Sequence, residues 1–334
     1  MKLPSNSSAA PVLSWSQLPP IPDHEGFAGS FVGAVDGALF VAGGANFPDK
    51  RPWEGGTKCW HDQVYLLEPG SAAWMEAGRL PVAGGYGASI SWQEGLLLIG
   101  GGDATRHFRD VWCVRRVNGA LRYEAWPALP QPLSMHSAAL VGERVYVTGG
   151  IDRPDARQAT KAFYALDLND RGAGWRELQP WPGPERLLAA IGEVDGSLYL
   201  ASGVRLVPDG KGGAKREWLC DAYRYDPGAG WQRLPDPPHP VVAAPVPCPT
   251  VNGSILVLGG DDGSQIGVAP PQHRGFPRTV LALNPNNGGW KRVGEVPFSL
   301  VTTTLVNWCG RLVVAGGEAR PGVRSPHVWA ATVV

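Results

Sequence analysis

The sequence predicts an all-β fold and, more specifically, a six-bladed β-propeller. Three observations carry this prediction: a double-glycine signal that recurs six times, a tight-turn signal before each one, and a tryptophan after most of them. A chain of 334 residues exceeds the usual size of one compact core, but repeat folds escape that limit because each unit packs only on its neighbours. We therefore expect a single propeller domain over residues 1–334, with residues 1–10 as a disordered tail.

Each repeat contains a short apolar run that ends in two glycines. A turn signal precedes each run, for example Asp36-Gly37 and Asn252-Gly253. Such dipeptides favour two-residue hairpins because both central residues need a positive φ. Another apolar segment precedes each turn, so strands a and b of every repeat form a hairpin. The six runs are LFVAGG, LLLIGG, VYVTGG, LYLASG, ILVLGG and LVVAGG, with first-glycine positions 43, 100, 149, 202 (a serine), 259 and 316.

Two further strands complete each repeat. A variable loop follows the glycines, then a third strand c such as QVYLLE or TVLALNP, and then a tryptophan that marks strand d. The sixth repeat stops after strand c, whereas the chain begins with an isolated d-type segment around Trp15. We expect Val12–Leu18 to pair with the last blade, which closes the ring and removes an exposed edge. Each strand-d tryptophan would wedge between adjacent blades: Trp15, Trp74, Trp126, Trp175, Trp231 and Trp290. Repeats of about this length, with a double glycine and a trailing tryptophan, resemble the kelch motif.

The loops between strands b and c are the long ones, and long loops on a rigid scaffold are where function concentrates. They cover 45–62, 102–110, 151–161, 204–220, 261–278 and 318–326. Directly after the double glycine, near the mouth of the central channel, only Asp261 and Glu318 are acidic. A partly desolvated carboxylate there could act as a general base, with Arg324 keeping it ionised or holding an anionic ligand. The alternative is an ion pair that only stabilises the loop.

Three segments give the chain a resemblance to the N-acetylneuraminate epimerases, or sialic acid mutarotases, of the kelch type. They are GGEARPGVR, the stretch LPPIPDHEGFAGSFVGAVDGALFVAGGANF with its following WEGG and lysine, and GPERLLAAIGEVDGSLYLASG. The chain looks most like a cyclically permuted branch, because the first segment lies in the last repeat here and in a middle blade in the family. The resemblance implies that Glu318 is the proton acceptor, that Arg324 contacts the sugar carboxylate, and that Arg186 is a further substrate contact.

The implied reaction exchanges the α- and β-anomers of N-acetylneuraminic acid or a related acidic sugar. Ring opening needs a base at the anomeric hydroxyl and an acid at the ring oxygen, and one carboxylate could serve both directly or through water. No metal or other cofactor is expected. The chain departs from the family at Gly84, where an arginine is usual, and at Gly102, where an acidic residue is usual, so the preferred sugar is left open. The alternative function is a non-catalytic propeller that binds a carbohydrate or a protein.

Composition excludes several other classes of function. Thirty basic residues balance thirty acidic ones, so nothing favours nucleic acid or an anionic membrane, and no apolar stretch approaches the ~18 residues of a membrane span. The seven histidines lie in different repeats without metal-site spacing. The beginning of the sequence shows no secretory signal, which favours the cytoplasm, and the periplasm is the alternative if a signal was removed. The pattern does not determine the oligomeric state.

Overall fold

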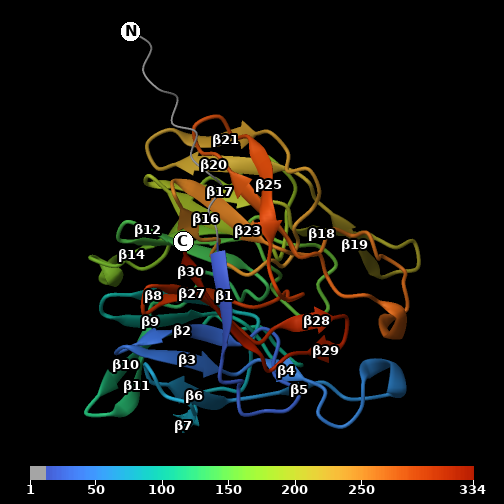
Figure 1. The fold of residues 1–334 in the computed structure, drawn as a ribbon. Helices are drawn as coiled ribbons and strands as arrows, with labels where there is room; N and C mark the ends of the chain where they lie inside the picture. Colours follow the sequence, from blue (N-terminus) through green and yellow to red (C-terminus); the bar gives the residue numbers. More distant parts are fainter. Residues whose placement is uncertain (1–12) are drawn as a thin grey trace.

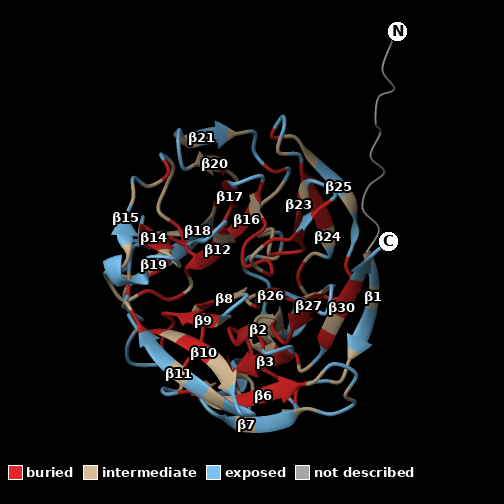
Figure 2. Ribbon diagram, turned by 90° about the vertical axis from the view of Figure 1, so that its left-hand side faces the viewer, coloured by how far each residue is buried: buried red, intermediate tan, exposed pale blue. Residues whose placement is uncertain are grey.

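The computed structural model describes residues 13–334, which form six four-stranded antiparallel sheets arranged as the blades of a propeller (Figures 1 and 2). The predicted fold class is confirmed. The first three blades are β2 (Phe31–Val35), β3 (Ala38–Ala42), β6 (Gln63–Leu67) and β7 (Met75–Arg79); β8 (Ala88–Trp92), β9 (Gly95–Ile99), β10 (Val111–Val117) and β11 (Ala120–Trp126); and β12 (Ser137–Val141), β13 (Arg144–Thr148), β14 (Phe163–Asp167) and β15 (Arg176–Glu177).

The other three blades repeat the same order of strands a to d. They are β16 (Ala190–Val194), β17 (Ser197–Ala201), β20 (Ala222–Asp226) and β21 (Gly230–Leu234); β22 (Thr250–Val251), β23 (Ser254–Leu258), β24 (Thr279–Leu283) and β25 (Trp290–Glu295); and β26 (Leu305–Trp308), β27 (Arg311–Ala315), β30 (Val328–Val333) and β1 (Leu13–Leu18). We number the blades 1 to 6 in this order. The expected tail, residues 1–10, lies outside the described residues.

The N-terminal strand closes the ring, as predicted. β1 pairs with β30 in antiparallel register from Leu13 opposite Val333 to Leu18 opposite Val328, and Figure 1 shows the first strand lying against the last. Trp15 packs edge-on against Phe298 at the end of blade 5, with ring centres 5.0 Å apart. The strand that begins the described chain thus completes blade 6.

Removing residues 1–18 is expected to lower the thermal midpoint and to cause aggregation, because it deletes β1 and leaves the β30 edge unpaired. Thermal melts followed by circular dichroism and light scattering measure both effects. The control is a truncation that removes only residues 1–12 and therefore keeps β1. Equal midpoints for the two truncations would contradict the proposed role of β1.

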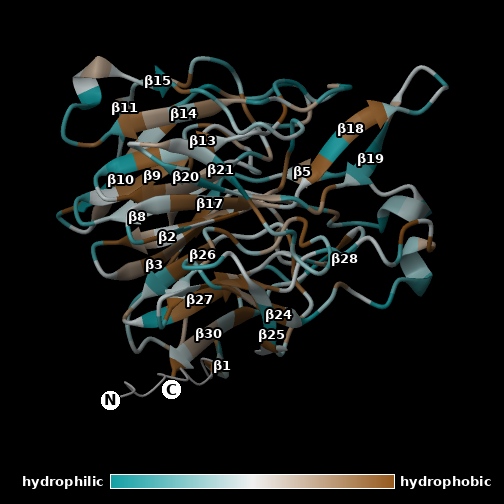
Figure 3. Ribbon diagram, turned by 90° about the horizontal axis from the view of Figure 1, so that it is seen from above, coloured by the Kyte–Doolittle hydropathy of each residue, from teal (hydrophilic) through white to brown (hydrophobic). Residues whose placement is uncertain are grey.

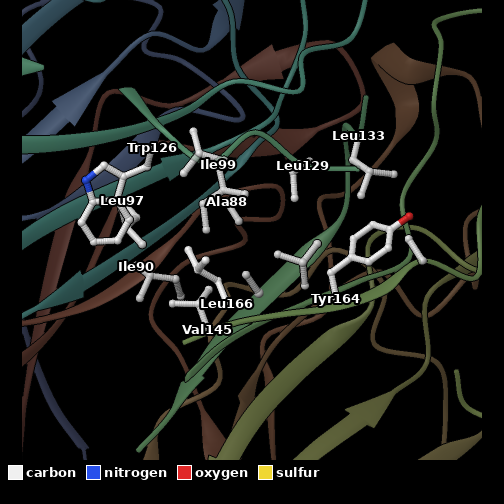
Figure 4. Packing of buried hydrophobic residues seen from close by; sticks show 14 of the residues in the cluster. Ala88, Ile90, Leu97, Ile99, Trp126, Leu129, Leu133, Val145, Tyr164 and Leu166 are labelled. Atoms are coloured by element: carbon white, nitrogen blue, oxygen red, sulfur yellow. The ribbon is translucent and has the colours of Figure 1, made fainter. Parts of the chain in front are cut away.

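In residues 13–334 the Nε1 atoms of Trp15 and Trp126 have no hydrogen-bond partner, whereas the other four strand-d tryptophans link neighbouring blades. Their indole nitrogens donate hydrogen bonds to carbonyl oxygens of the preceding blade: Trp74 to Pro19 at 2.8 Å, Trp175 to Pro127 at 2.8 Å, Trp231 to Gln179 at 3.0 Å and Trp290 to Pro235 at 3.0 Å. Buried apolar side chains fill the space between the sheets. Figure 4 shows this packing between blades 2 and 3, where Ile90, Leu97 and Ile99 meet Val145 and Leu166. Strands on the outer rim are largely exposed, whereas the inner strands are buried (Figure 2).

A closed ring of backbone hydrogen bonds surrounds the central channel. Six residues of the described chain, one per blade, each donate from N–H to the carbonyl of the residue in the neighbouring blade, at 2.7–2.9 Å. All six have a positive φ of 56–69°, although only the first is a glycine. Left-handed backbone costs a non-glycine residue about 1 kcal/mol, which the shared hydrogen bonds offset. The ring consists of Gly29, Tyr86, Met135, Leu188, Ala243 and Thr302.

The loops between strands b and c extend from one face of the propeller, where Figure 3 shows them projecting beyond the blades. Three of them contain extra hairpins and two contain 3-10 turns: β4 (Ala45–Asn46) with β5 (Cys59–Trp60), β18 (Val204–Pro208) with β19 (Ala214–Trp218), β28 (Glu318–Arg320) with β29 (Val323–Arg324), η1 (Pro52–Glu54) and η3 (Pro270–Gln272). A third 3-10 turn, η2 (Arg171–Ala173), lies in a c–d connection. Within residues 13–334, no helix has the length and apolar character needed to cross a membrane.

Candidate functional site

Loops of blades 1, 4, 5 and 6 meet at the mouth of the channel and enclose a cavity of about 410 Å³. Residues of the hydrogen-bonded ring line its inner end, where they separate it from a narrow cavity of about 50 Å³ inside the channel. A second cavity, of about 260 Å³, lies at the opposite end of the channel, so the cavity on the b–c face is the larger of the two. Its charged and polar lining side chains are Lys58, Tyr86, Arg216, Trp218, Asp261, Gln265, His273, Glu318 and Arg324.

Glu318 begins β28 and is fixed by one carboxylate oxygen. Its Oε1 accepts hydrogen bonds from the backbone N–H of Gly322 at 2.8 Å and from Nη1 of Arg324 at 2.5 Å. The tight β28–β29 hairpin causes this geometry, because Gly322 supplies a φ of 78° at the turn and the register sets Glu318 opposite Arg324. Among residues 13–334, Oε2 has no hydrogen-bond donor within reach, and the side chain keeps 21% of its surface exposed. One carboxylate oxygen is thus available to a ligand.

Arg324 is buried, with 7% of its surface exposed, and links blade 6 to blade 1. Its Nε donates to the carbonyl of Ala45 at 3.1 Å, its Nη2 approaches the Tyr86 hydroxyl at 3.5 Å, and the guanidinium lies 5.2 Å from the Phe47 ring centre. Burial alone would lower the pKa of Arg324, but the Tyr86 hydroxyl and the Glu318 carboxylate raise it on balance. The Nε–H and one N–H of Nη1 are used within the protein, so the second N–H of Nη1 and the N–H groups of Nη2 are the donors left for a ligand.

Lys58 and Tyr86 form the wall beside Arg324. The Lys58 ammonium lies 4.2 Å from the Tyr86 ring centre and 4.3 Å from that of Trp60. Burial and then the charge of Arg324 lower the pKa of Lys58 to about 8. Burial also raises the pKa of Tyr86 to about 12, so the phenol stays protonated. Lys58 is the lysine that follows WEGG in a segment that resembles the family, but nothing in the repeat pattern indicated that it meets Tyr86.

Blades 4 and 5 supply the opposite wall. Trp218 of β19 donates from Nε1 to Oδ2 of Asp261 at 3.1 Å, and Arg216 lies two residues earlier on the same strand. Apolar side chains fill in around them, among them Met135 and Phe276. Within loop 204–220, β18 and β19 form a hairpin that places Arg216 in the cavity lining.

The cavity carries more positive than negative charge. Lys58, Arg216 and Arg324 oppose the two carboxylates, Asp261 and Glu318. Burial lowers the pKa of the nearby His273, so that imidazole is mainly neutral at neutral pH. A cationic concave site of this kind favours an anionic ligand. Among residues 13–334, no group of three or more His, Cys, Asp or Glu side chains is arranged to hold a metal ion.

Arg186 does not belong to this cavity. Its side chain is fully buried, and all five of its N–H donors are used. Two donate to the carboxylate of Asp221, two to the carbonyl of Pro184 and one to the carbonyl of Ser202. The guanidinium lies between the rings of Trp181 and Tyr223. The expectation that Arg186 contacts the substrate is therefore corrected, since no donor remains and no part of the side chain reaches the cavity.

The two departures from the family pattern also lie away from the cavity lining. A Cβ atom at Gly84 would meet the Phe108 ring at 2.5 Å, and one at Gly102 would meet His107 at 2.4 Å. Loop 102–110 of blade 2 thus occupies the space next to both glycines.

The aromatic residues of loop 45–62 support the site rather than line it: Phe47 contacts Arg324, Trp60 contacts Lys58, and Trp53 packs near Gly322.

Comparison with known proteins identifies related sequences over most of the chain. The family model described as N-acetylneuraminate epimerase matches residues 6–120 and 126–268. An N-acetylneuraminate epimerase of Haemophilus influenzae is 29% identical over 229 residues, which cover 60% of this chain and 58% of that protein. An N-acetylneuraminate epimerase of Yersinia enterocolitica is 29% identical over 237 residues, covering 62% of this chain and 57% of its own. The matched part thus spans less than two thirds of each relative.

A solved structure, that of YjhT, has a similar fold. It superposes with a TM-score of 0.68 at 16% sequence identity and covers 95% of this chain and 99% of its own. At that identity the likeness concerns the fold alone. The family match ends at residue 268, so the hairpin that carries Glu318 and Arg324 lies beyond it.

Proposed function

Because the chain belongs to the N-acetylneuraminate epimerase family, we propose that it is a mutarotase that interconverts the α- and β-anomers of N-acetylneuraminic acid or a related acidic sugar. The observation that carries the proposal is the Glu318–Arg324 pair, which stands in a cationic cavity at the channel mouth. A cavity of about 410 Å³ is within the usual range for small-molecule sites, which is roughly 300–1,000 Å³.

The position of the pair in the last blade agrees with the proposed permutation of the family. A propeller is a closed ring, and a different start point leaves the packing of the blades unchanged. An alignment that keeps chain order would then lose the repeat that moved to the end. The match that stops at residue 268 supports this proposal, as does the N-terminal β1 that completes blade 6.

The chemistry follows from the geometry of Glu318. Its oxygen Oε2 is free to take the proton of the anomeric hydroxyl, while Arg324 and the N–H of Gly322 hold the carboxylate in place through Oε1. The sugar carboxylate is bonded to the same anomeric carbon, so it must lie beside Glu318 as well. Nη2 of Arg324 and the Lys58 ammonium are the cationic groups nearest to that position. Opening the ring, rotating the keto group and closing on its other face inverts the anomeric centre.

Catalysed exchange between the two anomers is the expected result with wild-type protein. Proton NMR of N-acetylneuraminic acid, started from one anomer, should reach equilibrium faster than in buffer, with little acceleration for neutral sugars such as glucose that lack the carboxylate. Binding of the acidic sugar without acceleration would favour the alternative, a non-catalytic carbohydrate-binding propeller. A protein that neither binds an acidic sugar nor accelerates its anomer exchange would contradict both the mutarotase function and the carbohydrate-binding alternative.

A further inference from the structure

Lys58 is a cation on the cavity wall that the proposed function places near the sugar carboxylate but to which it assigns no proton transfer. It follows the 3-10 turn η1 in the blade 1 loop and directly precedes β5. Its ammonium group is held by the faces of Tyr86 and Trp60. Among residues 13–334 it makes no ion pair, unlike Arg324, whose Nη1 is bonded to Glu318. Lys58 can therefore offer its N–H groups to a molecule in the cavity.

The groups around Lys58 make it a better proton donor than an ordinary lysine. Burial is the largest influence and the charge of Arg324 the next; Glu318 opposes them less strongly, and Arg216 adds the smallest lowering effect. Together they lower the pKa of Lys58 to about 8. An acid whose pKa lies near the working pH is both protonated and able to give its proton away, which is the condition for efficient general acid catalysis.

None of the arginine, tyrosine and histidine side chains that face the cavity from the described residues meets this condition. An arginine guanidinium does not release a proton at ordinary pH, so an arginine cannot be this acid. The pKa of Tyr86, raised to about 12 by burial, makes it a weaker acid than Lys58. Burial lowers the pKa of His273, so little of its protonated form exists at neutral pH.

We propose that Lys58 is the general acid that protonates the ring oxygen when the sugar ring opens, with Glu318 as the base on the anomeric hydroxyl. The inference rests on the proposed mutarotase function and deepens it. As the ring carbon–oxygen bond breaks, its electron pair takes a proton from the ammonium. The electron pair of the anomeric O–H bond forms the carbonyl while Glu318 accepts that proton. Ring closure on the other face reverses both transfers and restores the two residues.

The test compares kcat and kcat/KM for anomer exchange in wild-type protein, Lys58→Met and Lys58→Arg between pH 5.5 and 9.5. Wild-type kcat/KM should fall above about pH 8 as Lys58 loses its proton. Methionine keeps the length of the side chain but removes the proton, and should lower kcat about 100-fold or more. Arginine keeps the charge but cannot give up its proton, so Lys58→Arg should also lose kcat. Lys50→Met, an exposed lysine of the same loop, is the control and should keep wild-type rates.

Chemical rescue separates proton transfer from simple binding of the carboxylate. In Lys58→Ala, small primary amines should restore part of kcat, and the more acidic ammonium ions should restore more at equal occupancy. Circular dichroism melts check that each variant is folded. A Lys58 variant that raises KM but keeps the wild-type kcat and the fall in kcat/KM at alkaline pH would overturn the inference. The mutarotase function would not be affected by that result. An inert wild-type protein would overturn the function first, and the inference with it.

Discussion

Replacing Glu318 with glutamine is expected to lower kcat for anomer exchange about 10²- to 10⁴-fold, the usual contribution of a positioned general base. Glutamine retains an oxygen that can accept from Gly322 and Arg324, so the β28–β29 hairpin should keep its shape. What disappears is the ability to take a proton at the second oxygen. The loss should therefore appear in kcat, with sugar binding largely retained.

Exchange spectroscopy at saturating sugar measures kcat for this variant, and isothermal titration measures its affinity. The matched control is Glu217→Gln, which removes a carboxylate that is also paired with an arginine on the b–c face, 2.7 Å from Arg205, but does not line the cavity. The control should keep wild-type activity. Equal activity of Glu318→Gln and wild type would remove Glu318 from the mechanism.

Replacing Arg186 with methionine is expected to have the largest effect on stability. The change leaves the largely buried carboxylate of Asp221 without its charged partner in blade 4 and removes a donor from the Ser202 carbonyl, whereas the Pro184 carbonyl keeps its bond from Nε1 of Trp181. Breaking a buried ion pair by removing one member costs about 3–5 kcal/mol of the free energy of unfolding. Because Arg186 lies outside the cavity, the fraction that remains folded should keep wild-type kcat.

Urea unfolding measures this loss, and Arg205→Met is the control because its pair with Glu217 is solvent-exposed and worth at most about 1 kcal/mol. The pair also predicts a pH dependence. Burial alone would raise the pKa of Asp221, but hydrogen bonds and charge from Arg186 lower it on balance. A lowered folded-state pKa stabilises the protein above the unfolded-state value, near 4, and this contribution is lost as pH falls through the folded-state value. Arg186→Met with unchanged stability but lost sugar binding would restore Arg186 to the site.

Local pattern was sufficient to predict the blades and the pairing of Glu318 with Arg324. The recurring turns and glycines specify the length of the strands and their order in each blade. A Pro-Gly turn between two short segments sets residues 318 and 324 opposite each other. The closing strand followed from a missing strand d at one end and an extra one at the other. These are short-range signals, or consequences of an edge that must be paired.

The remaining parts of the site depend on contacts between distant segments. Lys58 and Tyr86 reach Arg324 only because ring closure puts blade 1 next to blade 6. Arg186 looked like a substrate contact because nothing in its own segment shows that Asp221, 35 residues later, will face it. Five of the six ring positions with positive φ had no glycine signal, since residues such as Tyr86 and Met135 adopt that conformation under the constraint of the neighbouring blades.

A crystal structure of Glu318→Gln with N-acetylneuraminic acid tests the central claim most directly. The account predicts one sugar in the cavity at the channel mouth, with its anomeric hydroxyl within hydrogen-bond distance of residue 318 and its carboxylate against Nη2 of Arg324 or the Lys58 ammonium. Sugar bound elsewhere on the propeller, or bound in this cavity with its anomeric carbon turned away from residue 318, would contradict it.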